Sequence, residues 1–225
     1  MRKAVILLLF GLIGWSASGQ KYNEIGLTIG ASGMAGDLND PWSNLAAAAY
    51  EMRPNIGIEF RHFFSPRHNM YTAFRMIHLH THEFNYGKPR GLKMNGNVSS
   101  LELRYEFNLR PYTRSTYSAS TMVDNDWWTP YIGLGGSGIY YNPNMQLKGM
   151  DPIKGFNDNV GFSGAVHFAF GVRFDLPRAM GCTIEFNEHV TFTDRLDGLE
   201  DGDPYDWFYC VNIGFSMLLL KKGFY

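Results

Sequence analysis

Three histidines at alternate positions form the most metal-like pattern in the sequence. His78, His80 and His82 are each separated by one residue, and residues i, i+2 and i+4 of a strand lie on one face. Three imidazoles on one face could bind Zn²⁺ or Cu²⁺. They span about 13 Å along an extended strand, so the strand would have to bend before all three reached one ion. A polar strand end is the favoured interpretation, and no metal site is assigned.

An acidic run near the C-terminus has the residue types of a calcium loop. Residues 197–203 combine four acidic side chains with two glycines, but they lack the spacing of the helix-loop-helix calcium motif. A solvated acidic loop is favoured.

A hydrolytic site is the third chemical alternative. His189 and Glu185 have the same parity in a predicted strand, and one known class of eight-stranded barrel deacylates lipid A with a Ser/His/acid set on its outer surface. No serine is marked as their partner, so internal packing of His189 is favoured. No catalytic residue and no cofactor is assigned.

Composition excludes several other classes. The 225 residues include 20 Lys and Arg against 21 Asp and Glu, so there is no basic excess for binding nucleic acid. The two cysteines, Cys182 and Cys210, have opposite strand parities and are not expected to bond. No small-molecule substrate is evident. Gly and aromatic residues are abundant, which favours strands and turns.

The first 19 residues have the pattern of a signal peptide. Arg2 and Lys3 precede the uncharged, mostly apolar run 4–15, and small residues stand at 17–19. The run is too short to cross a bilayer, which needs about 20 residues. The mature chain is therefore predicted to be exported and to comprise residues 20–225.

Eight later segments alternate between apolar and polar residues with period two, as strands with two different faces do. They are 22–33, 54–64, 69–82, 98–109, 128–141, 160–176, 181–193 and 205–219. In 160–176 one face carries Phe, Val and Leu, while the other is mostly Gly, Ser and Ala. Small residues suit the interior of an eight-stranded barrel, and bulky apolar residues suit lipid contact. We therefore predict an eight-stranded antiparallel transmembrane β-barrel of the outer-membrane type, with outer-membrane lipid around it. Its lumen is predicted to hold a buried charge network that includes Glu102, Arg104, Glu106 and Arg173.

The connections between the predicted strands alternate in length. The first, third, fifth and seventh are long, whereas 65–68 and 177–180 are tight turns. Outer-membrane barrels have short periplasmic turns and long external loops, so both termini are predicted to be periplasmic.

The connection 110–127 is too long for a simple periplasmic turn. It is either a polar, disordered turn or a docking element for a periplasmic partner, since polar segments with a few aromatic residues can become ordered on contact. We take docking as the functional hypothesis, with Arg110, Tyr112, Arg114, Tyr117, Asp124, Asp126 and Trp127 as its candidate residues.

A series of short motifs runs through nearly the whole mature chain. They are Ile25-Gly26 with Gly36-Asp37-Leu38-Asn39, Asn55-Ile56-Gly57, the run 101–108, Pro111-Tyr112, the run 129–135, Phe170-Gly171-Val172-Arg173, Thr191-Phe192-Thr193-Asp194 and Asp206-Trp207-Phe208. Their order resembles the PorG-type outer-membrane barrel of the type IX protein secretion system. The resemblance implies a non-enzymatic barrel that associates on its periplasmic side with lipoprotein-containing ring components of a secretion or gliding machinery. The alternatives are a narrow channel for small or apolar solutes, with a lipid-side opening near Gly135, Gly136 and Gly138, and a lipid A-modifying enzyme.

Overall fold

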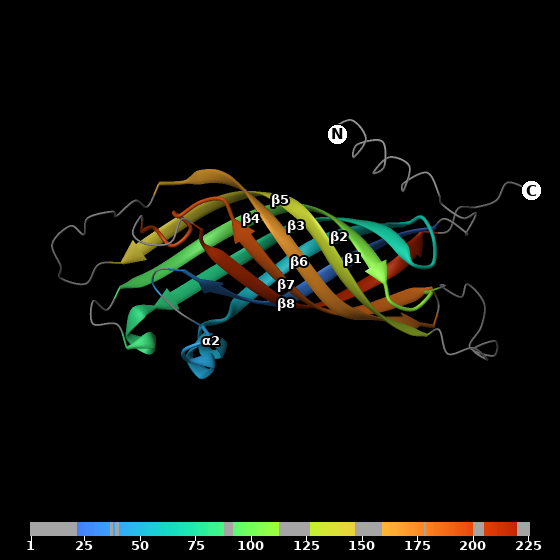
Figure 1. Ribbon diagram of the computed structural model, residues 1–225, viewed down its shortest axis with the longest axis horizontal. Coiled ribbons are helices and arrows are strands. Elements are labelled where there is room, and N and C mark those ends of the chain that lie inside the picture. The colour runs from blue at the N-terminus through green and yellow to red at the C-terminus, as the bar shows by residue number, and fades with distance from the viewer. Residues whose placement is uncertain are drawn as a thin grey trace, which may run out of the picture.

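The computed structural model describes residues 22–36, 38, 41–87, 92–112, 127–146, 159–177, 179–199 and 205–219. The predicted signal peptide lies outside them. Eight strands dominate (Figure 1). They are β1 (Tyr22–Ala35), β2 (Arg53–Phe63), β3 (His68–His82), β4 (Lys93–Asn108), β5 (Trp128–Gln146), β6 (Gly161–Leu176), β7 (Met180–Thr191) and β8 (Trp207–Leu219).

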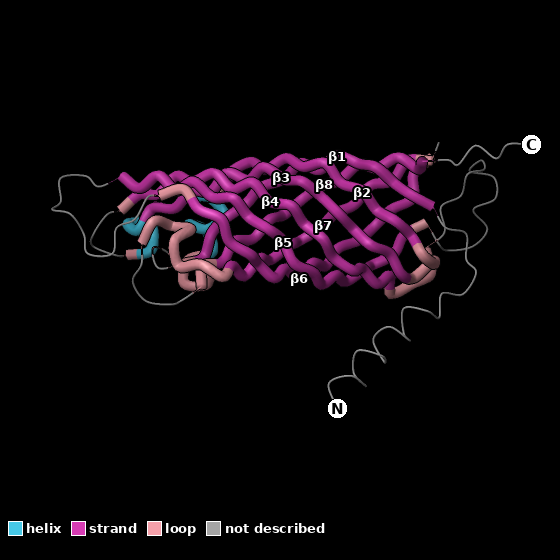
Figure 2. Tube along the Cα trace, turned by 90° about the horizontal axis from the view of Figure 1, so that it is seen from above, coloured by secondary structure: helices cyan, strands magenta, loops and turns pink. Residues whose placement is uncertain are grey.

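The strands form one closed antiparallel barrel in chain order, and β1 pairs with β8 to close it (Figure 2). The predicted architecture is therefore confirmed. We call the end where β1 begins and β8 finishes the termini end, and the opposite end the loop end. The connections 64–67, 109–127 and 177–179 lie at the termini end, and the other four lie at the loop end.

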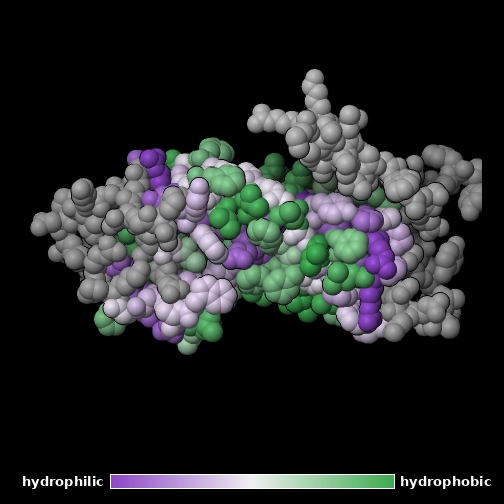
Figure 3. Space-filling view, in the orientation of Figure 1, coloured by the Kyte–Doolittle hydropathy of each residue, from purple (hydrophilic) through white to green (hydrophobic). Residues whose placement is uncertain are grey.

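The period-two pattern places polar groups inside and apolar groups outside. In β4, Leu101 and Leu103 are exposed while Glu102 and Arg104 are fully buried. The same alternation repeats around the barrel and gives an apolar belt over its middle (Figure 3). The belt includes Ile25, Leu27, Ile29, Ile56, Ile58, Phe60, Phe74, Met76, Leu101, Leu103, Ile132, Leu134, Phe168, Phe170, Ile184, Ile213, Phe215 and Met217. Glu188 of β7, which faces outward and pairs with Phe168, interrupts this belt. An apolar belt around ionic side chains is the arrangement of a membrane-spanning barrel.

At the loop end this polarity reverses on β3, β4 and β5. Met94, Val98 and Ile139 are buried inside, whereas the outward positions hold polar residues such as Asn97 and Asn142. β4 and β5 accordingly extend beyond the predicted segments, to Lys93 and Gln146. The predicted segments ended at 98 and 141, near the positions where the buried side chains change from polar to apolar. Beyond the lipid the exterior meets water, so the alternation is that of a soluble sheet.

The first loop-end connection contains a short helix, α2 (Leu45–Glu51), where the sequence pattern predicts only a loop. Four consecutive alanines favour the helix. The Asn44 side chain caps it by accepting a hydrogen bond from the Ala47 N–H at 3.1 Å. A 3₁₀ turn, η1 (Glu83–Tyr86), follows β3. Among the helices of the described ranges, none has the length and apolar character needed to cross a bilayer.

Candidate functional site

An ion-pair network fills the middle of the lumen. The Glu106 carboxylate on β4 forms ion pairs with Arg104, Arg173 and Arg61, with N···O distances of 2.7 Å, 2.5 Å and 3.4 Å. These arginines come from β4, β6 and β2, and all are buried. One carboxylate therefore connects strands on different sides of the barrel.

Arg104 also reaches across the lumen from β4 to β7. Its guanidinium donates to Glu185 and, at 2.7 Å, to the Asn187 side chain, both on β7. The guanidinium carbon also lies 3.8 Å from the ring centroid of Tyr71. Tyr131 on β5 donates to the same Glu185 carboxylate. Buried charges with several charge-assisted hydrogen bonds are a rigid filling rather than a free conduit.

The predicted charge network is confirmed but incomplete. Glu102, Arg104, Glu106 and Arg173 are all buried in the lumen, and Arg75 pairs with Glu102 at 3.1 Å. Arg61, Arg75 and Glu59 also belong to the network but were not predicted, and Glu185 was predicted only as a possible catalytic residue. Strand parity could have found them, because each occupies an inward position of its predicted strand.

Aromatic side chains close the lumen at the termini end. The Tyr22 and Phe63 rings stack with centroids 4.3 Å apart, and the Tyr112 ring lies 6.1 Å from that of Phe63. The Arg173 guanidinium lies 4.3 Å from the Tyr131 ring centroid. Tyr112 is fully buried here, and its N–H donates to the Pro66 carbonyl at 2.9 Å.

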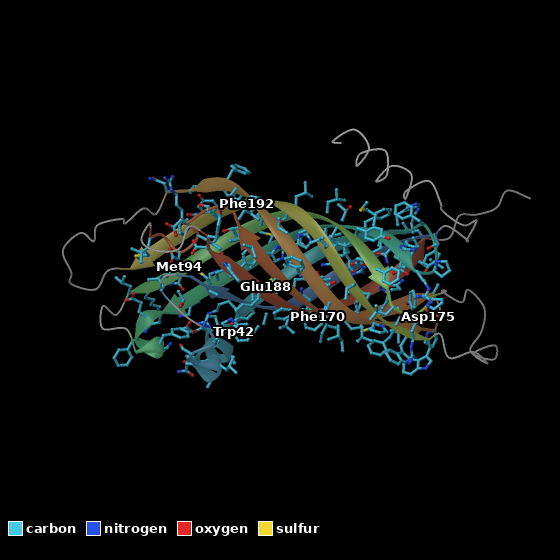
Figure 4. The ribbon with its side chains drawn as sticks, in the orientation of Figure 1. Trp42, Met94, Phe170, Asp175, Glu188 and Phe192 are labelled. Carbon is cyan, nitrogen blue, oxygen red and sulfur yellow. The ribbon has the colours of Figure 1, made fainter. Side chains whose placement is uncertain are left out.

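An apolar cluster closes the loop end. Strand residues such as Met94, Ile139 and Phe208 meet Leu38, Leu196 and Leu199 from the connections, and all are buried. Figure 4 shows Met94 at this end and Asp175 at the opposite one. Between the cluster and the ion pairs, His167 and His189 lie 4.9 Å apart, and His189 stacks on Phe208 at 4.3 Å. The lumen is therefore filled in three successive layers: aromatic, ionic and apolar.

The model of one protein family, described as a domain of unknown function (DUF6089), matches residues 3–215. The chain belongs to the DUF6089 family. No curated protein is detectably similar to it in sequence.

Several solved structures have a backbone similar to that of this chain. Neisserial surface protein A matches with a TM-score of 0.49 at 10% identity, over 88% of this chain and 96% of that one. Ail of Yersinia pestis, in complex with the heparin analogue sucrose octasulfate, matches with a TM-score of 0.46 at 9% identity, over 88% and 99%. The N-terminal β-barrel domain of Pseudomonas aeruginosa OprF gives 0.45 at 10% identity, over 88% and 100%. The barrel assignment for this DUF6089 chain rests on its own strand pairing.

The histidine triplet of this DUF6089 barrel lies on the outer face of β3 near the loop end. Nδ1 of His78 bonds Asn97 Oδ1 and Nδ1 of His80 bonds Asn95 Oδ1, each at 2.8 Å across the β3–β4 pair. The His82 ring packs edge-on to Phe84. Within the described ranges, no three His, Cys, Asp or Glu side chains are placed to hold a metal ion.

The two residues considered for lipid hydrolysis face the lumen. Glu185 and His189 share a face, as predicted, but both are buried among Arg104, His167 and Phe208. Both therefore face the lumen and not the lipid-facing surface, where a lipid substrate would bind. Cys182 and Cys210 are free and lie on opposite faces of the wall, as predicted.

The acidic run is described only over residues 197–199. Asp197 is fully buried, and its Oδ1 accepts from the Leu199 N–H at 2.8 Å. The expectation of a wholly solvated loop is therefore wrong for Asp197, because its carboxylate orders a turn whose Leu199 packs into the apolar cluster.

The barrel wall is continuous at the glycines considered for a lateral opening. Gly135, Gly136 and Gly138 all pair with β4 on one side and β6 on the other. Gly135 packs against Arg104, where an added Cβ would lie 2.4 Å from the Arg104 Cβ. The ladder pairing leaves no gap between strands at this height.

The candidate docking connection is described only at its two ends. Arg114, Tyr117, Asp124 and Asp126 lie outside the described residues. Arg110 and Trp127 are exposed, and the Arg110 guanidinium lies 4.4 Å from the Trp128 ring centroid. Tyr112 differs from the prediction, because its buried ring belongs to the aromatic layer of the lumen and is not part of an exposed docking surface.

Proposed function

We propose that this protein is a non-enzymatic outer-membrane barrel that anchors or positions periplasmic ring components of a type IX secretion or gliding machinery. The filled lumen is the observation that carries the proposal. Ion pairs occupy its middle, and aromatic and apolar layers close its ends. A barrel without a free interior can act only through its outer wall and its two ends.

The membrane location is supported by the apolar belt. Leu101 and Phe170 are 61% and 60% exposed, and such side chains around a whole barrel are suited to lipid rather than water. The orientation is supported by the connection lengths, because two of the three termini-end connections are tight turns while the loop end carries long connections. The termini end is accordingly proposed to face the periplasm.

Connection 110–127 is proposed as the docking element. Its two ends are held together at the barrel rim, where the Leu109 N–H donates to the Pro130 carbonyl at 2.9 Å and the Thr129 hydroxyl donates to the Arg110 carbonyl at 3.0 Å. Trp127 packs against Trp128 and Phe174 and remains about half exposed. A segment anchored at both ends and flanked by an exposed Trp and Arg has the composition typical of protein interfaces.

A pair of deletions of equal length tests this proposal. Removing residues 113–124 is expected to leave a barrel whose gel mobility still shifts on heating, but to abolish copurification of the periplasmic partner from gently solubilised cells. Removing residues 147–158, at the loop end, is expected to change neither property. Partner recovery that survives the first deletion, or is lost with the second, contradicts the docking assignment.

A further inference from the structure

Four large apolar side chains stand out from the loop end on α2, η1 and the segment before α2. Trp42, Leu45, Tyr50 and Phe84 are 78%, 65%, 80% and 73% exposed. We call these four residues the Trp42 platform. They are as exposed as charged residues usually are on a soluble protein, although burial would be favourable for each of them.

The acidic residues of the same segments point the opposite way. Glu51 and Glu83 are fully buried, and residues 41–50 contain no charged side chain. The large side chains that these segments expose are therefore apolar or aromatic, beside the uncharged Ser43 and Asn44, while the carboxylates of Glu51 and Glu83 are turned toward the protein. A water-facing loop has the reverse arrangement.

Hydrogen bonds join the segments that carry the platform. The Glu51 carboxylate accepts from the His82 N–H at 2.9 Å, from Asn85 Nδ2 at 2.6 Å and from the Tyr86 hydroxyl at 3.0 Å. Asn44 Nδ2 donates to the Asn85 carbonyl at 3.1 Å. The first and second loop-end connections are thus joined into one unit, and the exposed side chains sit on a rigid support.

The platform lies beside the barrel wall rather than across its mouth. α2 contacts β1 and β3 and projects sideways from the loop end (Figure 1), and Trp42 lies on this side of the barrel (Figure 4). The chain passes from α2 through Arg53 into β2, whose first belt residue is Ile56, paired with Met76. The exposed β2 residue between them is Pro54, so the α2 part of the platform adjoins the loop-end edge of the apolar belt.

We propose that the Trp42 platform is a lipid-binding surface that rests in the interfacial layer of the membrane at the loop end. Trp and Tyr combine an apolar ring with a polar N–H or O–H, which favours the boundary between acyl chains and headgroups. Leu45 and Phe84 contribute apolar area that enters the same boundary. The inference rests on the proposed membrane location, and it adds a second contact with lipid besides the belt.

Depth-dependent quenching of Trp42 tests the proposal. Trp15, Trp127, Trp128 and Trp207 are replaced by Phe, so that Trp42 is the only Trp in the chain. The protein is reconstituted into phosphatidylcholine vesicles whose acyl chains carry bromine either near the glycerol or near the chain end. We expect the shallow bromines to quench Trp42 several-fold more than the deep bromines, and aqueous iodide to quench it weakly.

A belt reporter separates this proposal from the membrane location. In a matched chain Trp42 is also replaced by Phe, and Phe168→Trp places the only Trp in the belt. If lipid bromines quench this reporter while iodide strongly quenches Trp42 in the first chain, the platform proposal is overturned and the membrane location stands. Shielding of Trp42 from both bromine and iodide overturns it too, because a protein then covers the platform. A belt reporter that lipid bromines do not quench overturns the membrane location itself.

Two further comparisons extend the test, and the first does not depend on the folding of the Trp-depleted chain. In the otherwise native chain, Trp42→Phe is expected to reduce the part of the emission that shallow bromines quench. In the Trp42-only chain, Leu45→Ser with Phe84→Ser is expected to raise iodide quenching of Trp42 several-fold, whereas the exposed neighbour change Ala46→Ser leaves it unchanged. If Ala46→Ser raises iodide quenching of Trp42 as much as the Leu45→Ser and Phe84→Ser pair does, the large apolar side chains have no special role.

Discussion

Arg104 pairs with two carboxylates of the lumen, Glu106 and Glu185. In Arg104→Met, Glu106 keeps Arg173 at 2.5 Å and Arg61 at 3.4 Å. Glu185 loses its close cation and, among the residues that the structure describes, keeps Arg75 at 3.9 Å and Arg61 at 4.0 Å. Removing one partner of a buried ion pair costs about 3–5 kcal/mol, so Arg104→Met is expected to reduce the free energy of unfolding by that amount.

A double-mutant cycle identifies Glu185 as the source of the loss. Glu185→Gln removes the carboxylate charge but keeps an oxygen that can accept from Tyr131. In the Arg104→Met background it is expected to restore part of the stability, with a coupling energy of about 0.5–3 kcal/mol. The assay is reversible urea unfolding in lipid vesicles, followed by heat-modifiable gel mobility and Trp fluorescence.

Arg67 provides the control for this cycle. It is an exposed arginine in the β2–β3 turn, and Arg67→Met is expected to change stability by no more than about 0.5 kcal/mol. The reasoning is refuted if Arg104→Met behaves like Arg67→Met. It is also refuted if the Arg104 and Glu185 changes add without coupling, because the network would then not connect β4 and β7 energetically.

Three further outcomes follow from the wall, the loop-end unit and the filled lumen. Gly135→Ala is expected to lower the free energy of unfolding by about 1–3 kcal/mol through overpacking, because its Cβ would lie 2.2 Å from the Leu103 carbonyl oxygen. Gly138→Ala is the control, since nothing lies within 4 Å of a Cβ there. Equal urea midpoints of the two variants would contradict this packing. Glu51→Ala is expected to leave the barrel folded but to speed protease cleavage within 36–52 several-fold, since three donors lose their acceptor; cleavage at the native rate argues against the joined unit. Purified protein in planar bilayers is expected to give no stable current steps, and steps that persist through repurification would show that the lumen is not sealed.

The sequence predicts most of the barrel because period two is a local property of extended backbone. All eight strands were located from it, and the inward parity correctly placed Glu102, Arg104, Glu106 and Arg173 in the lumen. The predicted ends of β4 and β5 were too short at the loop end. At the loop end the inward positions become apolar and the outward ones polar, and the predicted segment for β4 began at 98 instead of Lys93, near this exchange of faces.

The candidate site was less predictable than the strands. Tyr112 lies in a connection with aromatic and polar residues, and its composition suggests an exposed docking residue. The structure buries its ring beside Phe63 because the connection folds back under the barrel rim, where the Tyr112 N–H meets the Pro66 carbonyl. Glu51 would be expected in water from its type alone, yet it is the buried acceptor that joins two connections.

The sequence by itself determined the number of strands, their order, the two faces of the wall and the asymmetry of the connections, since each depends on residues close together in the chain. Tertiary structure alone decided the partners. Arg104 meets Glu185 across 81 positions, and Glu51 meets Tyr86 across 35. Such pairs depend on the tilt and stagger with which the sheet closes, and the alternation of residues along a single strand carries no information about either.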